Sequence, residues 1–586
     1  MALRQFTLLS NTTLFKNKIV SSLSTMNKSC VPCSVQCKAS SIITSDQNNT
    51  SRRSGNYFRP SIWSHDYIQS LTSDFVETSY AEETDRLKEE VRLMLLKLEN
   101  PMDQLELIDI LQRLGVDHHF GLEISNIIKN IYKNRDQLKR NNNLFATALE
   151  FRLLRQHGYD VSSEVFKGFL DDNGNFQSGL SIDIKGILSL YEASFLSMEG
   201  EIILDEARDL SSTSLKEFVC QNNEENETSP LVNHALELPL HWRISRLEAR
   251  WFIDVYERRQ NMSPALLKLA KLDFNILQAK YQEDLKNTSR WWKRIGLGEK
   301  LNFSRDRMVE NFVWTVAFAE EPRFGYYRRV ATKVNALITT IDDVYDLYGE
   351  LEELEIFTEV IDRWDINGID SLPEYMKICF LALYNFVNEV AFDILKESGR
   401  NIIPHLKKVW ANLCKSYLVE AKWYRSGYQP NLHEFLENAW ITSSGSVMLV
   451  HAYCVLSNSS LLDSVCLEEY YGLIRSSSII LRLVNDLATS KREKETGDIP
   501  KAVECYISET GASDADARRH MNSLICETWK KINKEATNSP DFKSFIEVAL
   551  NVVRMSLCMY EHGDGHSIQD PETMKSITSL LFLPIV

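Results

Sequence analysis

The sequence predicts an all-α fold made of two helical domains. From about residue 80 onwards, apolar residues recur every three to four positions through most of the chain, which is the period of amphipathic helices. Sustained alternating runs bounded by tight hairpin dipeptides, which would indicate strands, do not occur in the sequence. Its 586 residues exceed one ordinary domain, and a hydrophobic content of 44% is enough for large cores.

The N-terminal segment has a different composition from the rest. The first 45 residues contain no Asp or Glu, are rich in Ser and Thr, and carry five basic side chains. This composition is typical of an organelle transit peptide, so we expect residues 1–51 to be a removable leader. Cys30, Cys33 and Cys37 in this segment lack the four closing ligands of a zinc site. The other eight of the 11 cysteines are expected to be ordinary buried thiols.

Charge and hydropathy exclude two classes of partner. The net charge of −15 makes nucleic acid and anionic membranes poor partners. No run of about 18 consecutive apolar residues occurs, so we expect no membrane span.

Residues 52–260 are predicted to form the first helical domain. An apolar stripe that includes Leu87, Val91 and Leu98 predicts a helix, which Pro101 ends. Four further stretches continue the helical pattern as far as ERR at 257–259. In FLDDNGNFQ, the acidic pair precedes Asn-Gly, which predicts a turn and not an acidic site.

Residues 261–586 are predicted to form the second domain. Ser263–Pro264 is a helix-start signal, with Ser as the cap and Pro in the first turn. Long helical patterns follow, as a bundle with a central cavity requires.

An acidic segment, ITTIDDVYDLYG, lies within this second half. On a helix, Asp346 shares a face with Asp342 and Asp343, because residues three and four apart are neighbours. Carboxylates that converge in this way repel one another unless a hard divalent cation binds. Mg²⁺ takes one or two carboxylates, several waters and phosphate oxygens. The alternative is a solvated acidic face.

A second segment, LRLVNDLATSKREKE, carries another set of oxygen donors. Asn485, Thr489 and Glu493 fall at i, i+4 and i+8, which is one line along a helix. Arg482 lies one turn earlier on the same face, where it can reach a diphosphate oxygen. This segment therefore predicts a second metal site beside a phosphate-binding arginine.

A third segment, FSRDRMVENFVW, supplies Arg305 and Arg307, which are permanently charged and suited to phosphate. Metal ligands on two separate helices, together with several basic groups, predict a diphosphate held by metal ions between two walls.

With these motifs, the chain resembles the plant terpene synthases, and most closely the angiosperm monoterpene synthases that act on geranyl diphosphate. IDDVYD looks like the family's DDxxD motif, NDLATSKRE like its second metal motif, and RDR like its RxR motif. Arg52, Arg53 and Trp63 look like its N-terminal arginine-pair motif, with nine residues in place of the usual eight before the Trp. The pattern DxDD, which the family's other chemistry needs, is absent from the sequence.

The resemblance implies a class I terpenoid synthase bundle with a central cavity in the C-terminal half and an α-barrel-like N-terminal domain without chemistry of its own. It implies Mg²⁺ or Mn²⁺, three ions per site, bound by Asp342, Asp343, Asp346 and the second motif. It implies diphosphate binding by the arginines and by Lys501, in GDIPKAVECY. It also implies a plastid location, and a monomer is expected.

Several residues are expected around the carbocation. In the family, an aromatic at the position of Trp314 lies against the substrate, and a C-terminal segment like MYEHGDGH closes the pocket, with Tyr560 and His566 available for proton transfer. Asn335 and Met448 are expected to line the cavity. From the residues alone, other readings stay open: Trp314 as plain core, Tyr560 and His566 as a polar surface loop, and Asn335 as a partner of backbone groups.

The expected reaction is ionisation of geranyl diphosphate to diphosphate and a monoterpene olefin or alcohol of the limonene, terpineol, cineole, linalool, myrcene or ocimene type. Three alternatives stay open: a sesquiterpene synthase that uses farnesyl diphosphate, a prenyltransferase on a similar bundle, and a non-catalytic isoprenoid-diphosphate binder.

Overall fold

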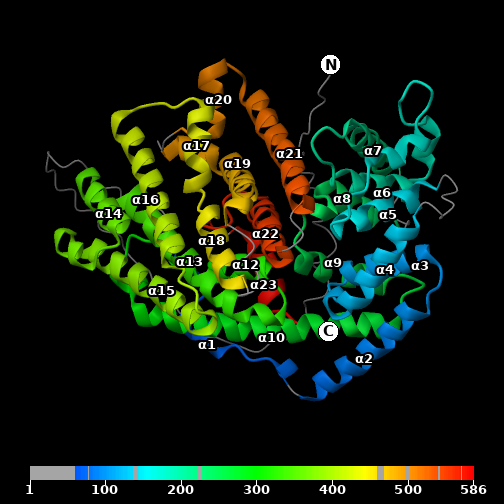
Figure 1. Ribbon diagram of the computed structural model, residues 1–586, viewed down its shortest axis with the longest axis horizontal. Helices are drawn as coiled ribbons and strands as arrows, with labels where there is room; N and C mark the ends of the chain where they lie inside the picture. The colour runs from blue at the N-terminus through cyan, green and yellow to red at the C-terminus, as the bar shows by residue number, and fades with distance from the viewer. Residues whose placement is uncertain are drawn as a thin grey trace, which may run out of the picture. The chain divides into compact units, whose positions relative to one another are not determined.

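A computed structural model describes residues 60–76, 78–135, 143–221, 227–457, 467–496, 500–538, 542–568 and 570–586. The described residues all belong to one compact unit. The described residues are almost entirely helical (Figure 1), which confirms the all-α prediction. Within those ranges, the single β contact is an isolated bridge between Leu170 and Phe176.

The N-terminal half consists of short helices around an apolar core. They are α1 (His65–Ser70), α2 (Thr78–Lys97), α3 (Pro101–Arg113), α4 (Gly121–Asn134), α5 (Leu144–Gln156), α6 (Ile184–Ser194), α7 (Ile202–Gln221), α8 (Ser229–Glu237) and α9 (Ser245–Glu257). Pro101 follows the end of α2 and is the first residue of α3. Its missing N–H breaks no hydrogen bond at this position, because the first N–H groups of a helix have no partner within the helix. The Asn100 side chain caps the helix by accepting from Met102 N. The predicted turn at Asp171 is confirmed, since its carboxylate accepts from two backbone N–H groups, those of Asn173 and Asn175.

Helix α10 (Pro264–Ile295) joins the two halves of the unit. It begins where the Ser263–Pro264 signal predicts, with the Ser263 hydroxyl accepting from Leu266 N. One end of the helix packs against α2 and α9, and the other packs against the C-terminal helices (Figure 1). Its 32 residues therefore contribute to both cores.

The C-terminal half is a larger bundle. Its helices are α11 (Leu297–Lys300), α12 (Met308–Phe318), α13 (Gly325–Asp343), α14 (Leu351–Arg363), α15 (Glu374–Ser398), α16 (Ile403–Ser426), α17 (Leu432–Thr442), α18 (Gly445–Leu456), α19 (Tyr471–Thr496), α20 (Ala502–Thr510), α21 (Asp514–Asn538), α22 (Lys543–Met559) and α23 (Pro571–Leu581). Every residue of α12 is buried. Helix α12 packs on α13 and α22, while α18 contacts α13, α16 and α19, so α12, α13, α18 and α19 form the centre of the bundle.

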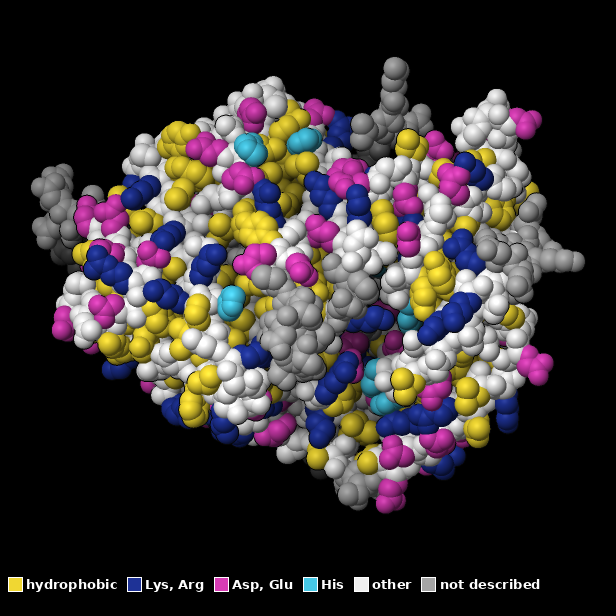
Figure 2. Space-filling model, in the orientation of Figure 1, with side chains coloured by type: hydrophobic (Ala, Val, Ile, Leu, Met, Phe, Trp, Pro, Cys, Tyr) yellow, Lys and Arg dark blue, Asp and Glu magenta, His cyan; other side chains and the backbone are white. Residues whose placement is uncertain are grey.

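Contacts from α21 to the N-terminal half fix the two halves together. The Asn533 amide donates to the carbonyls of Phe195 and Ser197 at 3.0 and 2.9 Å, and the rings of Trp242 and Trp529 stack at 5.5 Å. On the face shown in Figure 2, acidic and basic side chains are interspersed among apolar ones.

One described helix is long and apolar enough to cross a membrane by length and composition. It is α15, and 44% of its most apolar window is buried inside the protein; the bent pair α17 and α18 passes the same test if it is counted as one span. A core helix has the same properties, so the absence of a membrane span stays a prediction.

Candidate active site

The first wall of the site is built at the end of α13. Helix α13 ends at Asp343 and continues as a π-helical turn, Val344–Tyr348, which carries Asp346. The acidic motif was expected to lie on a regular α-helix, but its second part forms a wider, π-helical turn. Single π turns of this kind occur frequently at functional sites. Asp342 and Asp346 both lie close enough to the buried Tyr417 to interact with it electrostatically, so the turn keeps the two carboxylates together.

Arg305 lies against this wall. Its guanidinium contacts Asp342 Oδ2 at 2.5 Å and Asp343 Oδ1 at 2.9 Å. Burial alone would lower the pKa of Arg305, but the Asp343 and Asp342 carboxylates raise it above its ordinary value. Arg305 is therefore a fixed cation beside the acidic motif.

Asp343 is arranged differently from Asp342. It is 1% exposed, and its Oδ2 accepts from Arg305 N at 2.7 Å and from the Ser304 hydroxyl at 3.2 Å. The carboxylate faces the 304–305 loop, whereas the Asp342 side chain keeps 27% of its surface exposed. The sequence grouped Asp343 with the metal ligands, but its contacts favour a role in positioning the arginine loop.

The second wall is α19, which runs through all three residues of the predicted line. Thr489 is buried, and its hydroxyl donates to the Asn485 carbonyl at 3.0 Å. The Asn485 side chain lies near the Tyr560 hydroxyl and lowers its pKa. The backbone of Glu493 belongs to the same helix, while its side chain lies outside the described residues.

Arg482 and Lys501 are brought together by a residue that the sequence did not single out. Asp486 is completely buried; its Oδ1 lies 2.8 Å from Arg482 Nε, and its Oδ2 accepts from Ala502 N at 3.1 Å. This carboxylate ties the start of α20, next to Lys501, to the arginine on α19. The only sequence signal for it was its place beside Asn485 in the second motif.

Tyr560 connects the two walls. Besides Asn485, its hydroxyl lies near enough to interact electrostatically with Arg482 of the second wall and with Arg305 and Asp564 beside the first. Burial raises its pKa above the ordinary value, so the phenol is neutral. The groups predicted from separate stretches of sequence therefore surround one shared site.

The C-terminal segment 560–568 closes against both predicted phosphate-binding arginines. The Ser567 hydroxyl accepts from Arg305 Nη1 at 2.9 Å, and the Ser567 carbonyl accepts from Arg307 Nη2 at 3.0 Å. Asp564 Oδ1 accepts from Ser567 N at 2.9 Å, which fixes the turn. Any side chain at Gly565 would place its Cβ 2.4 Å from the Met559 carbonyl oxygen, so the segment packs tightly there.

An aromatic and a polar group lie beside this segment. Trp314 is 5% exposed, and its ring meets that of Tyr560 at 6.2 Å and 62°. His566 Nε2 lies 3.5 Å from the Thr339 hydroxyl on α13. Burial, with a further contribution from Arg305, lowers the pKa of His566 to about 3, so the imidazole is neutral at pH 7.

Asn335 belongs to a small polar cluster on α13 that includes Thr339. Asn335 Nδ2 donates to the Asn311 carbonyl at 3.3 Å, whereas its buried Oδ1 has no hydrogen-bond partner among the described residues. The Thr339 hydroxyl donates to the Asn335 carbonyl and lies 3.5 Å from Asn311 Oδ1. No spacing signal in the sequence pointed to Asn311 or Thr339.

Met448 lies in the first turn of α18, is 6% exposed, and follows a break in the helix. At this break Ser444, not Gly445, takes the left-handed conformation, with φ of 65°. The hydroxyls of Tyr417 and Ser444 are hydrogen-bonded at 3.0 Å. Gly445 permits close approach instead, since a Cβ there would lie 2.6 Å from the Ser478 hydroxyl.

The arginine-pair arm is described only from residue 60 onwards, so Arg52 and Arg53 lie outside the described residues. Trp63 packs against Phe582 near the C-terminus, with ring centroids 4.8 Å apart. Helix α1 follows and lies along α10, where His65 Nδ1 is 2.8 Å from the Ser289 hydroxyl.

The donor set fits a hard divalent cation. The first wall offers the carboxylates of Asp342 and Asp346, and the second offers an amide oxygen from Asn485 and a hydroxyl from Thr489. Oxygen ligands of this kind suit Mg²⁺ and Mn²⁺, and no thiolate or imidazole stands in the predicted set to favour a softer metal.

Comparison with known proteins identifies the family. Residues 62–236 match the family model "Terpene synthase, N-terminal domain", and residues 293–531 match "Terpene synthase family, metal binding domain". The chain is 56% identical to a (−)-alpha-terpineol synthase of Vitis vinifera over 91% of both chains. It is 55% identical to a chloroplastic myrcene synthase of Quercus ilex over 94% of this chain and 92% of that one.

Solved structures show the same likeness. Limonene synthase with 2-fluorolinalyl diphosphate superposes with a TM-score of 0.88 at 45% identity, covering 92% of this chain and 100% of that one. Isoprene synthase from grey poplar (Populus x canescens), solved with three Mg²⁺ ions and dimethylallyl-S-thiolodiphosphate, gives a TM-score of 0.81 at 44% identity over 89% and 99%. The chain belongs to the terpene synthase family.

Proposed function

We propose that the chain is a monoterpene synthase that ionises geranyl diphosphate, releases diphosphate and converts the allylic cation into a monoterpene olefin or alcohol. The observation that carries this proposal is the position of Tyr560, between Asn485 and Arg482 on one side and Arg305 and Asp564 on the other. It supports a single site with metal ligands and cations on two walls. Relatives named for terpineol and myrcene, both ten-carbon products, favour the C10 substrate.

Diphosphate binding is assigned to both walls. Arg305, Arg307 and Arg482, with Lys501, bind and orient the leaving group. Asp342 and Asp346 on one side, and Asn485, Thr489 and Glu493 on the other, hold Mg²⁺ or Mn²⁺, with three ions per site as in the poplar structure. The chemistry that these ions supply when bound is Lewis-acid stabilisation of the leaving diphosphate. Fixed guanidinium groups add to it, because preorganised charge needs no reorganisation during the reaction.

The segment 560–568 excludes water from the hydrocarbon part of the substrate, since it already contacts Arg305 and Arg307. Trp314 presents an aromatic ring to the cation, an interaction worth roughly 0.5–2 kcal/mol. Met448, at the start of α18, shapes the apolar side. These groups protect a species that water would otherwise quench at random.

Termination of the reaction is assigned to the polar groups at α13. Neutral His566, whose buried Nδ1 has no hydrogen-bond partner among the described residues, accepts the proton that leaves the cation, and Tyr560 of the same segment is the second candidate for proton transfer. The buried Asn335 Oδ1 orients a water molecule when the product is an alcohol. The balance between the two outcomes decides whether an olefin or an alcohol forms.

For the chain as a whole, we propose that residues 1–51 are a transit peptide to the chloroplast, as the names of the chloroplastic relatives suggest. Residues 52–260 then form the N-terminal helical domain with its arm, and residues 261–586 form the catalytic domain of a monomer.

The test is incubation of the chain lacking residues 1–51 with geranyl diphosphate and Mg²⁺ or Mn²⁺, followed by chiral gas chromatography and a diphosphate assay. We expect a C10 product with equimolar diphosphate, abolished by a chelator. A product from farnesyl diphosphate alone would favour a sesquiterpene synthase. A longer diphosphate formed when isopentenyl diphosphate is added would favour a prenyltransferase, and binding without diphosphate release would overturn the proposal.

A further inference from the structure

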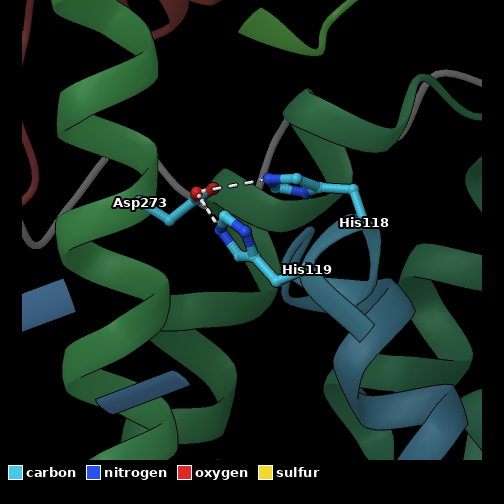
Figure 3. A group of neighbouring side chains, drawn as sticks. All are labelled: His118, His119 and Asp273. Atoms are coloured by element: carbon cyan, nitrogen blue, oxygen red, sulfur yellow. Dashed lines mark hydrogen bonds and ion pairs between the residues drawn. The ribbon is translucent and has the colours of Figure 1, made fainter. Parts of the chain in front are cut away.

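Away from the active site, two adjacent histidines face one buried carboxylate. His118 and His119 lie in the 3₁₀ turn Asp117–Phe120 between α3 and α4, and Asp273 lies on α10. Figure 3 shows both imidazole rings directed from their turn towards the Asp273 carboxylate. The donor atoms of the three side chains all lie within 4.8 Å of one another.

Both histidines present the same ring atom to the same oxygen. His119 Nε2 is 2.7 Å and His118 Nε2 is 3.5 Å from Asp273 Oδ1. The other oxygen, Oδ2, is held by Arg246 Nη1 at 3.3 Å, and Arg246 in turn donates to the Gly115 carbonyl at 3.2 Å. Oδ1 is therefore the common point of the cluster, and Arg246 fixes the orientation of the carboxylate, as partners of metal ligands do.

The two histidines contact Asp273 unequally. His119 makes a short hydrogen bond to it, whereas the ion-pair contact of His118 Nε2, at 3.5 Å, is at the outer limit of a hydrogen bond. His118 Nε2 is buried and has no hydrogen-bond partner among the described residues. Protonation of both imidazole rings is unfavourable, because the two positive charges would repel each other at a centroid distance of 3.9 Å and Arg246 already supplies one positive charge.

From this arrangement we infer that His118, His119 and Asp273 form a binding site for a divalent transition metal of the Zn²⁺ type, separate from the site for the diphosphate. Imidazole nitrogens and a carboxylate oxygen are common zinc ligands, and three protein ligands leave a fourth position for water. A metal accepts the lone pairs of both neutral rings at once, which accounts for the convergence of His118 Nε2 on the carboxylate.

The geometry is close to what such an ion requires. Ligand bonds of about 2.0–2.1 Å in a tetrahedron place donor atoms roughly 3.3 Å apart. The two measured separations from Asp273 Oδ1, 2.7 and 3.5 Å, lie on either side of that value. All three donor atoms lie within 4.8 Å of one another, so rotation of the imidazole rings is the movement expected when an ion binds.

The charges around the cluster also suit a dication. Asp117 and Glu320 interact electrostatically with His118, as does Arg246. Asp273 is the carboxylate that faces the two imidazoles, with Asp117 and Glu320 as further acidic groups near His118 and Arg246 as the guanidinium that holds Asp273 Oδ2. The site would tie the turn before α4 to α10, so its expected role is to stabilise the contact between the N-terminal helices and α10.

The experiment uses the full chain, stripped with a chelator and then dialysed against Zn²⁺ or Co²⁺ in excess Mg²⁺, which occupies the oxygen-donor sites. We expect one tightly bound Zn²⁺ per chain, with nitrogen ligands at about 2.0–2.1 Å in X-ray absorption. We also expect intense visible bands from four-coordinate Co²⁺ and a higher melting temperature with Zn²⁺.

Variants locate the ion. H118N, which keeps a polar side chain, and H119A should each weaken Zn²⁺ binding by at least about tenfold and remove the Zn²⁺-dependent rise in melting temperature. H405A, which removes an exposed histidine on α16, and D342N should leave both unchanged. The inference is overturned if wild type binds no Zn²⁺ in excess Mg²⁺, if H118N and H119A retain it, or if D342N loses it. None of these readouts depends on turnover, so they are independent of the proposed function.

Discussion

The N-terminal helices and the active site treat buried charge in different ways. On α9, Glu248 accepts from Arg113 and from His234, each at 2.7 Å, and its side chain is 3% exposed. In the active site, the Asp342 side chain keeps 27% of its surface exposed beside Arg305. The first carboxylate is enclosed by partners from the protein, whereas the second is positioned but still accessible. Enclosed charges serve stability, and accessible ones remain available for a ligand.

Asp342→Asn tests whether the accessible carboxylate serves the reaction and not stability, and it should have the largest effect. Loss of this carboxylate should lower turnover about a thousandfold, roughly 4 kcal/mol of transition-state stabilisation, with the melting temperature unchanged. Steady-state assays with geranyl diphosphate and a thermal melt measure the two effects. Asp362→Asn, at a half-exposed position on α14 where the carboxylate pairs with Lys415, is the matched control and should change neither. Turnover of Asp342→Asn within tenfold of wild type would contradict the assignment.

The opposite pattern is expected for Glu248→Ala. Removal of an enclosed carboxylate leaves Arg113 buried without its partner, which should cost about 3–5 kcal/mol of unfolding free energy while kcat at low temperature is kept. Urea unfolding and initial rates measure this. Glu257→Ala removes an exposed partner of Lys271 and should cost under about 1 kcal/mol. Equal losses in the two variants would show that the enclosure of Glu248 is unimportant.

The pH dependence of the same pair adds a second test. Burial opposes ionisation of Glu248, but Arg113 and His234 outweigh it and lower its pKa to about 2 from 4.5. Its stabilising contribution is therefore complete above pH 4.5 and is lost as the pH falls from there towards 2. Wild type should lose stability over this range, and the loss should be smaller in Glu248→Ala.

A smaller effect is expected at Glu192, which is half-buried without an equivalent ion pair. Burial raises its pKa to about 7 from 4.5, so the folded state stays protonated while the unfolded state ionises, and stability falls as the pH rises from 4.5 to 7. Glu192→Gln, which can still accept from Leu240 N, should be more stable at pH 8 by about 1–3 kcal/mol and equal to wild type at pH 4.5. Melting temperatures at the two pH values decide this.

The smallest effect is expected at Asn335. In Asn335→Leu, loss of the amide oxygen should lower the ratio of alcohol to olefin by up to about tenfold, since one hydrogen bond contributes roughly 0.5–1.5 kcal/mol, with total turnover largely kept. Gas chromatography measures the ratio. Thr340→Val, which removes another buried hydroxyl on α13, should leave it unchanged. An unaltered ratio in Asn335→Leu would remove Asn335 from the termination step.

Much of the fold was predictable because it rests on local patterns. The apolar period and the Ser263–Pro264 signal correctly predicted where α10 begins. The Asn-Gly that follows the acidic pair correctly predicted the turn at Asp171. The left-handed conformation of Ser444 at the α17–α18 break was not predictable, because glycine adopts it more readily than serine and the hydrogen bond between Tyr417 and Ser444 comes from a distant helix.

The same limit applies to the site. The spacing of the two motifs predicted that Asp342 and Asn485 each lie on a helix beside further ligands. It could not show that a π-helical turn interrupts the helix between Asp343 and Asp346. Nor could it show that Asp343 turns towards Arg305 N and Ser304, because those contacts depend on how a loop folds back on α13. Thr339 and Asn311 meet only when α12 and α13 pack, so no pattern in one segment could identify them.

Helix α10 sets a limit on how the molecule can be divided. Leu266, Leu269, Ala270 and Phe274, in its first half, are all buried, and this half packs against α2 and α9. A fragment that begins at residue 261 would carry these side chains uncovered into water, and exposed apolar surface of this kind promotes aggregation. The catalytic bundle therefore depends on the N-terminal helices for its solubility, even if those helices take no part in the reaction.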